Sequence, residues 1–94
     1  MEIGDKYLPI GTVVKLKEGI KKLMITGYCF REENNPTVVW DYTGCLYPEG
    51  ILVASQLVVF NHSQIEEIYY KGLEDEEVEE FMKMLEEMSK KEND

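Results

Sequence analysis

Few residues in this chain have the chemistry of a catalytic site. His62 is the single histidine, Cys29 and Cys45 are the two cysteines, and Asp41 lies between a tryptophan and a tyrosine. A catalytic histidine needs a nucleophile and an orienting acid within hydrogen-bond reach, and no nucleophile motif surrounds His62. Neither cysteine stands in a known catalytic signature. We therefore predict no catalytic residues and no enzymatic activity, and we interpret His62 as a turn residue between two strands.

The spacing of the same residues does not favour a metal or cofactor site. Structural zinc needs four ligands, commonly in closely spaced pairs, whereas Cys29, Cys45 and His62 are far apart in the sequence. The acidic C-terminal part has no calcium-loop pattern, and the glycines are dispersed among turns rather than gathered in a phosphate-binding loop. We expect no metal and no cofactor. Asp41 is either a buried functional acid or, as is more common, an outward-facing residue of a strand.

The net charge of −9 is concentrated at the C-terminal end. Residues 1–73 carry nine acidic and seven basic side chains, and residues 74–94 carry ten acidic and three basic ones. Duplex nucleic acid and anionic membranes bind clustered lysine and arginine, so we expect neither as a partner. No apolar run approaches the ~20 residues of a membrane span, and no signal peptide is visible. We expect a cytoplasmic protein with reduced cysteines.

The elements that position these residues are short strands followed by one helix. Runs of alternating apolar and polar residues, bounded by glycine, proline and asparagine, are typical of strands. They predict five strands, over 12–17, 22–31, 37–47, 57–60 and 65–71. One helical or 3₁₀ turn, capped by Asn61, is predicted before the last strand. The 94 residues suffice for one domain, with a β part over 1–73 and an acidic helix and tail over 74–94.

Alternation also assigns faces to the strands. In the third strand, Trp40 and Tyr42 share a face, which we take as the core face because the opposite face carries Asp41. In the last strand, Ile68 and Tyr70 are predicted to point inward.

The second strand contains Gly27, which predicts a bulge or a sharp bend of the kind that small barrels need at their corners. Unbroken alternation places Leu23 and Ile25 on one face of this strand, and Met24 and Tyr28 on the other.

Residues 75–91 are predicted to form the one helix. Asp75 is a suitable N-cap, and acidic residues follow it at the positive end of the helix dipole. Phe81, Met82 and Leu85 belong to an apolar stripe with helical spacing. The stripe either packs on the sheet of the same chain or offers a methionine-rich surface to a partner.

The order of these elements predicts a mainly β fold of the α+β type. Five short strands, a helical turn before the last one and a C-terminal amphipathic helix resemble an SH3-like small barrel, and a strongly bent antiparallel sheet fits nearly as well. SH3-like barrels often bind peptides through exposed aromatic grooves. The chain has more aromatic residues than so small a core can hold, and Tyr42, Tyr47 and Pro48 are the predicted exposed cluster. The alternative is that these residues fill the core.

Three motifs resemble a known family. They are Tyr-Leu-Pro-Ile-Gly-Thr-Val-Val-x-Leu-Lys over 7–17, Asp-Tyr-x-Gly-Cys-x-Tyr-Pro-Glu-Gly over 41–50 and Phe-Asn-His-x-x-Ile over 60–65. Together they are similar to small uncharacterised proteins of Gram-positive bacteria that share only a domain-of-unknown-function label. The resemblance implies a place beside type VII secretion components and LXG-type toxin effectors, where such proteins act as accessory, targeting or chaperone proteins. It implies no catalytic residue.

We therefore expect a non-enzymatic accessory or adaptor protein that binds another protein, a type VII secretion effector or its machinery. The expected contact residues are Tyr42, Tyr47 and Pro48 in the β part and Phe81, Met82 and Leu85 on the helix. A second hypothesis is a module that binds a peptide or single-stranded RNA through an aromatic face, although the acidity of the chain opposes RNA.

Overall fold

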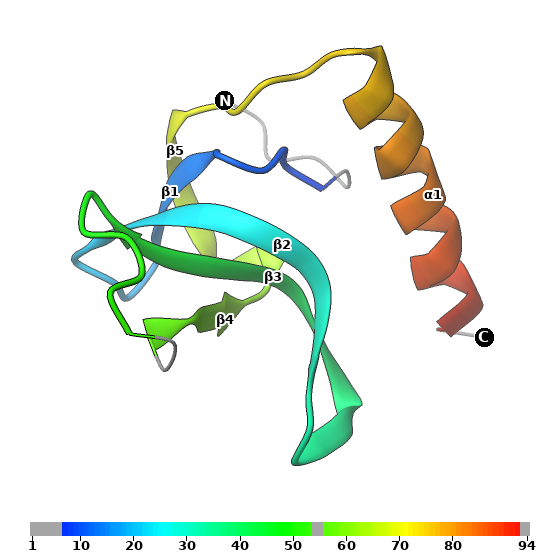
Figure 1. The fold of residues 1–94 in the computed structure, drawn as a ribbon, viewed down its shortest axis with the longest axis horizontal. Coiled ribbons are helices and arrows are strands. Elements are labelled where there is room, and N and C mark those ends of the chain that lie inside the picture. The colour runs from blue at the N-terminus through cyan, green and yellow to red at the C-terminus, as the bar shows by residue number, and fades with distance from the viewer. Residues whose placement is uncertain (1–6, 54–55, 93–94) are drawn as a thin grey trace.

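A five-stranded antiparallel sheet and one C-terminal helix make up the fold (Figure 1). The structure, a computed structural model, describes residues 7–53 and 56–92. A 3₁₀ turn, η2, precedes the last strand. The elements in chain order are β1 (Val13–Leu16), β2 (Lys22–Glu32), β3 (Asn35–Tyr47), β4 (Val58–Phe60), η2 (His62–Gln64), β5 (Ile65–Tyr70) and α1 (Glu76–Glu92).

The strands lie side by side in the order β4-β3-β2-β1-β5. β1 to β4 pair with their sequence neighbours, and β5 returns across the molecule to pair with β1. Within the described residues no pairing joins β4 to β5, so the sheet is open rather than a closed barrel. The five predicted strands, the 3₁₀ turn and the helix are confirmed, and their ends differ from the predicted ones by at most two residues.

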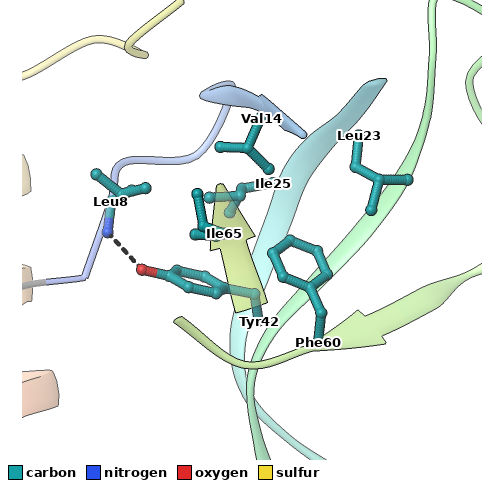
Figure 2. Packing of buried hydrophobic residues seen from close by; sticks show 7 residues of the cluster. All are labelled: Leu8, Val14, Leu23, Ile25, Tyr42, Phe60 and Ile65. Carbon is teal, nitrogen blue, oxygen red and sulfur yellow. Dashed lines mark hydrogen bonds between the residues drawn. The ribbon is translucent and has the colours of Figure 1, made fainter. Parts of the chain in front are cut away.

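The concave face of the bent sheet holds the hydrophobic core (Figure 2). Every strand contributes at least one side chain, and the segment before β1 contributes a leucine. The buried members are Leu8, Val14, Leu23, Ile25, Tyr42, Phe60 and Ile65. Burial of each large apolar side chain stabilises the fold by about 1.5–3 kcal/mol, and because these residues come from every strand, the strands stabilise one another. Tyr42 confirms the predicted core face of β3.

β2 contains the bulge that Gly27 predicts. The pairing of β2 with β3 shifts between Ile25 and Gly27, which leaves Thr26 as an extra residue. One extra residue reverses the alternation beyond it, and Tyr28 packs against the core together with Ile25. The prediction that Tyr28 and Ile25 lie on opposite faces is therefore wrong, because it assumed unbroken alternation.

A second bulge lies in β5. Val14 pairs with Ile68 and Val13 pairs with Tyr70, so Tyr69 is the extra residue. Ile68 packs against the core, as predicted. Tyr70 is 65% exposed and lies beside Val13 on the other face of the sheet. The prediction that Tyr70 points inward is wrong, because the bulge turns it over.

The helix α1 lies beside the sheet (Figure 1). Its first turn is capped as predicted, since the Asp75 Oδ1 atom accepts a hydrogen bond from the Val78 backbone N–H at 2.9 Å. Met82 and Leu85 are buried, and the Phe81 ring lies 6.0 Å from the Tyr28 ring between centroids. The apolar stripe of α1 is therefore turned toward its own sheet. Over the described part of the chain, no helix combines the length and apolar character needed to cross a membrane.

Candidate functional site

The predicted aromatic cluster is not a single surface. Tyr42 is fully buried in the core, whereas Tyr47 and Pro48 are exposed at the end of β3. Tyr42 and Tyr47 are five positions apart in one strand, and an odd spacing puts two residues on opposite faces. The prediction that Tyr42 is exposed beside Tyr47 is therefore wrong, and the spacing already contained the reason.

Two of the three predicted helix residues line a hollow of about 420 Å³ beside α1. Phe81 and Met82 line this hollow from α1, and Tyr28 and Leu73 line it from the β part. Met82 and Leu85 are buried, while Phe81 is partly exposed. Two of the three predicted helix contacts thus serve the packing of α1 within the molecule.

A group of partly buried polar side chains lies beside Tyr42. Its hydroxyl oxygen accepts a hydrogen bond from the Leu8 backbone N–H at 3.0 Å, and lies 2.6 Å from the His62 Nδ1 atom. The Asp41 Oδ2 atom accepts the His62 backbone N–H at 2.9 Å, and the Asn61 Oδ1 atom accepts the Asp41 backbone N–H at 3.0 Å. These bonds fasten the segment before β1 and the turn η2 to the middle of β3.

The chemistry of this group is structural. The Tyr42 hydroxyl and the His62 Nδ1 atom share one hydrogen bond, whose donor depends on the tautomer of the His62 ring. The His62 Nε2 atom is buried and has no hydrogen-bond partner among the described residues. Asp41 binds the backbone of His62 rather than its ring, so it does not orient the imidazole as a catalytic acid does. Burial raises the pKa of Tyr42 well above its ordinary value, against the effect of the Leu8 hydrogen bond. A phenol that is held neutral is a poor nucleophile, and the arrangement instead fixes the core.

Tyr28 has a related role. Its hydroxyl donates a hydrogen bond to the Leu8 carbonyl oxygen at 2.7 Å, and burial raises its pKa to about 12. The two tyrosines therefore hold both backbone polar groups of Leu8. Cys29 and Cys45 are free, and no group of three or more potential metal-ligating side chains occurs among the residues that the structure describes.

An open hollow of about 620 Å³ lies on the face of the sheet opposite the core. We call it the aromatic groove. Its lining residues come from four strands and the turn between β1 and β2, and they are Val13, Ile20, Lys21, Lys22, Tyr47, Tyr69 and Tyr70. Such a volume is within the usual range of about 300–1,000 Å³ for ligand sites.

Strand pairing builds the groove. Lys22 of β2 pairs directly with Tyr47 of β3, and Val13 of β1 pairs directly with Tyr70 of β5. Directly paired residues share a face, so these four side chains form a band across four neighbouring strands. The bulged residue Tyr69 and the turn between β1 and β2 close its ends.

Two lysines give the groove its charge. The Lys22 Nζ atom lies 5.5 Å from the centroid of the Tyr47 ring, in cation–π geometry. The Lys21 Nζ atom lies 2.6 Å from the Glu49 Oε2 atom at the rim. The hydrogen bond from Lys21 lowers the pKa of Glu49. Among the residues that the structure describes, no carboxylate lines the groove, although the chain as a whole carries a charge of −9.

Of the groove residues, only Tyr47 was among the predicted contact residues. Lys21 and Lys22 form a basic pair where the turn after β1 meets β2, and Tyr69 and Tyr70 form an aromatic pair at the end of β5. These two dipeptides were the features of the sequence that could have pointed to the aromatic groove. Their meeting depends on the pairing of Val13 with Tyr70, which joins residues far apart in the sequence.

Comparison with known proteins places the chain in a family without adding a named relative. Residues 7–81 match the family described as Domain of unknown function (DUF4176). No curated protein and no solved structure shows significant similarity to the chain. The match covers most of the sequence and includes the whole sheet, with the bulges at Thr26 and Tyr69, and the beginning of α1. The three motifs predicted a family that has only a domain-of-unknown-function label, and the chain belongs to such a family, DUF4176.

Proposed function

We propose that this protein is a non-enzymatic accessory protein that binds another protein. The observation that carries the proposal is the aromatic groove, where large apolar and aromatic side chains stay open to solvent. Ile20 is 96% exposed, and Tyr47 and Tyr70 are 40% and 65% exposed. Contiguous exposed apolar surface of this kind is typical of interaction sites, and tyrosine is enriched at the centres of protein interfaces.

The finer fold assignment supports the same function. We propose that the open sheet is a member of the SH3-like class, on the strength of its strand order and the 3₁₀ turn directly before β5. Folds of this class commonly bind peptide segments on aromatic surfaces. This support is an analogy of fold, and the residues of the groove are what give it content.

The partner class comes from the motifs that resemble the Gram-positive family. We propose a type VII secretion effector, or a component of the secretion machinery, as the bound protein. Binding of an effector before export takes place in the cytoplasm, which is where we place the complex. An accessory protein needs exposed apolar contact surface and no catalytic group, and the aromatic groove supplies such a surface.

The test is reconstitution of the complex. The full-length protein, tagged, is co-expressed with LXG-type effectors of the same organism and purified in low and high salt. We expect a stoichiometric complex that survives gel filtration, and a Tyr47→Ala variant that recovers less effector. Absence of any complex with the neighbouring effectors, under all salt conditions and with folded protein, would count against the accessory function.

One observation favours a second candidate, a module for single-stranded RNA. The groove combines lysines with exposed tyrosine rings on which bases can stack. Aromatic stacking together with basic residues is the usual basis of single-strand binding. Two lysines are few for a phosphate backbone, and the charge of −9 opposes a polyanion. Fluorescence anisotropy with oligouridine distinguishes the candidates, because RNA binding must weaken steeply as salt rises.

A further inference from the structure

We propose that the aromatic groove binds an acidic segment of a partner polypeptide, in which carboxylate side chains flank one aromatic or aliphatic anchor. This inference rests on the proposed accessory function and specifies the chemistry of its partner. It follows from the shape of the groove, from its charge, and from what the rest of the molecule leaves open.

The shape fits an apolar anchor. Val13 forms an almost fully buried floor, with 5% of its surface exposed, and it lies between the tyrosines of β3 and β5. An aromatic or leucine side chain placed over Val13 would contact the rings of Tyr47 and Tyr70 and release water from all three. Contacts between aromatic rings add to the stabilisation that comes from the buried apolar area alone.

The charge fits flanking carboxylates. The two ionisable cations of the lining are Lys21 and Lys22, and the lining contains no acid. The ammonium group of Lys22 has three donors, so it can bind a carboxylate while its stem stays against the Tyr47 ring. Lys21 bonds to the exposed Glu49, and water and salt screen an exposed ion pair of this type. A carboxylate of the partner can therefore replace Glu49 at little cost.

The overall charge selects a short acidic segment over a nucleic acid. A peptide with two or three carboxylates needs only the two lysines of the groove. A nucleic acid carries one negative charge per nucleotide and needs a track of basic residues along its whole length. The net charge of this chain is −9, which repels such a polyanion. Over distances beyond the Debye length of about 8 Å, salt screens the remaining repulsion of the peptide.

The molecule leaves the groove accessible. In Figure 1 the helix α1 lies on the opposite side of the molecule from the turn between β1 and β2, whose residues Ile20 and Lys21 line the groove. The acidic helix therefore does not cover the groove of its own chain. The α1 helix of a second copy is the competing acidic occupant, and the experiment separates it from a partner peptide.

The experiment uses the full-length protein and three matched, fluorescein-labelled peptides. The first peptide has glutamates on both sides of a central phenylalanine and leucine. The second replaces every glutamate by glutamine, and the third replaces every glutamate by lysine. Fluorescence anisotropy measures the dissociation constants. We expect the acidic peptide to bind about tenfold or more tightly than the glutamine peptide, from two ion pairs of modest strength, and we expect no binding of the lysine peptide.

Variants and mapping locate the contact. Lys22→Gln should weaken binding of the acidic peptide toward that of the glutamine peptide, whereas Lys83→Gln, the same charge change on exposed α1, should not. Tyr70→Ala should weaken the acidic and glutamine peptides alike. NMR shift mapping on the unmodified protein needs no variant, and it should place the perturbed amides at Val13, at Ile20 to Lys22, at Tyr47 and at Tyr70.

Each contrary result has a distinct meaning. Equal binding of the acidic and glutamine peptides, shifts confined to the hollow beside α1, or tighter binding of oligouridine each overturn the acidic-segment proposal. Concentration-dependent sedimentation of the protein alone, with shifts at the groove, identifies a second copy as the occupant and also overturns it. If an effector complex forms and Lys22→Gln behaves like Lys83→Gln, the accessory function stands and only the groove assignment fails. If the acidic peptide binds and no effector does, the accessory function fails instead.

Discussion

At the scale of single residues, the hydroxyl group of Tyr42 does more for the fold than the ring alone. It bonds to the Leu8 backbone and to His62. Tyr42 is fully buried, so water does not readily replace these hydrogen bonds. The same buried position explains why Tyr42 cannot belong to a contact surface. The single histidine, which in sequence was the first candidate for chemistry, is instead a partner of this hydroxyl.

Replacement of Tyr42 by phenylalanine tests this role. The ring is kept, but the Leu8 N–H and the His62 Nδ1 atom lose their partner. A buried polar group without a partner costs about 1–3 kcal/mol, so Tyr42→Phe should lower the free energy of unfolding by that amount in urea denaturation. The exposed Tyr69→Phe is the matched control and should change stability by less than about 0.5 kcal/mol. Equal effects of the two variants would show that the hydroxyl bonds are dispensable.

The raised pKa values of Tyr28 and Tyr42 predict alkaline unfolding. In the unfolded chain a tyrosine ionises near pH 10, whereas in the fold Tyr28 ionises at about 12 and Tyr42 higher than its ordinary value. The stability that these neutral phenols contribute is thus complete below pH 10, and it is lost as the pH rises toward and beyond 12. We expect part of the tyrosinate absorbance to appear only together with loss of the circular dichroism signal. Full ionisation of all tyrosines near pH 10 with the fold intact would refute this.

At the scale of elements, bulges and glycines decide which side chain faces which way. The extra residues Thr26 and Tyr69 each turn over the remainder of a strand. One bulge carries Tyr28 into the core, and the other carries Tyr70 out to the aromatic groove. The close approach of β3 to its neighbours depends in turn on Gly44.

Alanine at Gly44 tests that approach. A Cβ atom at this position would lie 2.9 Å from the Met24 carbonyl oxygen and 2.9 Å from the Phe60 Cε1 atom. The first contact is with backbone of the paired strand, which cannot move away without loss of pairing. Gly44→Ala should therefore destabilise the fold by about 1–3 kcal/mol in thermal or urea unfolding. Gly19→Ala is the control, because its Cβ atom would have no contact closer than 3.6 Å, to Leu16, and it should be near neutral.

At the scale of the whole molecule, the two faces of the sheet differ, and the helix α1 packs beside only one region of the sheet. The concave face holds the core, and the opposite face holds the aromatic groove. The helix α1 buries Met82 and Leu85 and places Phe81 near Tyr28. Most of the stability of a helix in a protein comes from packing of its apolar face, so the stability of α1 depends on this packing.

The coupling between α1 and the sheet is tested by Leu85→Ala. Leu85 is 4% exposed, and removal of a buried leucine side chain typically costs about 2–5 kcal/mol. We expect a single unfolding transition, seen by both helix and tyrosine signals, with a lower midpoint. Met84→Ala, on the exposed side of the same helix, should leave the midpoint nearly unchanged. Separate transitions for helix and sheet signals would show that α1 is not coupled to the core.

Local sequence patterns were enough to predict the strands, the 3₁₀ turn and the helix of this protein. Alternation, glycine and proline punctuation and the Asp75 cap are local signals, and they predicted five strands, a 3₁₀ turn and a C-terminal helix close to their observed ends. The motifs over 7–17, 41–50 and 60–65 also led to the family, because they contain the turns and the core strands together.

The surface that the protein presents depends on contacts between residues far apart in the sequence. The sheet is open because β4 and β5 do not pair, and the groove exists because Val13 meets Tyr70 while Lys22 meets Tyr47. These meetings depend on long-range register, and one bulged residue is enough to exchange the two faces of a strand. A local pattern of alternation contains no information on that register, so the buried position of Tyr42 beside His62 and the exposed position of Tyr70 were settled by packing.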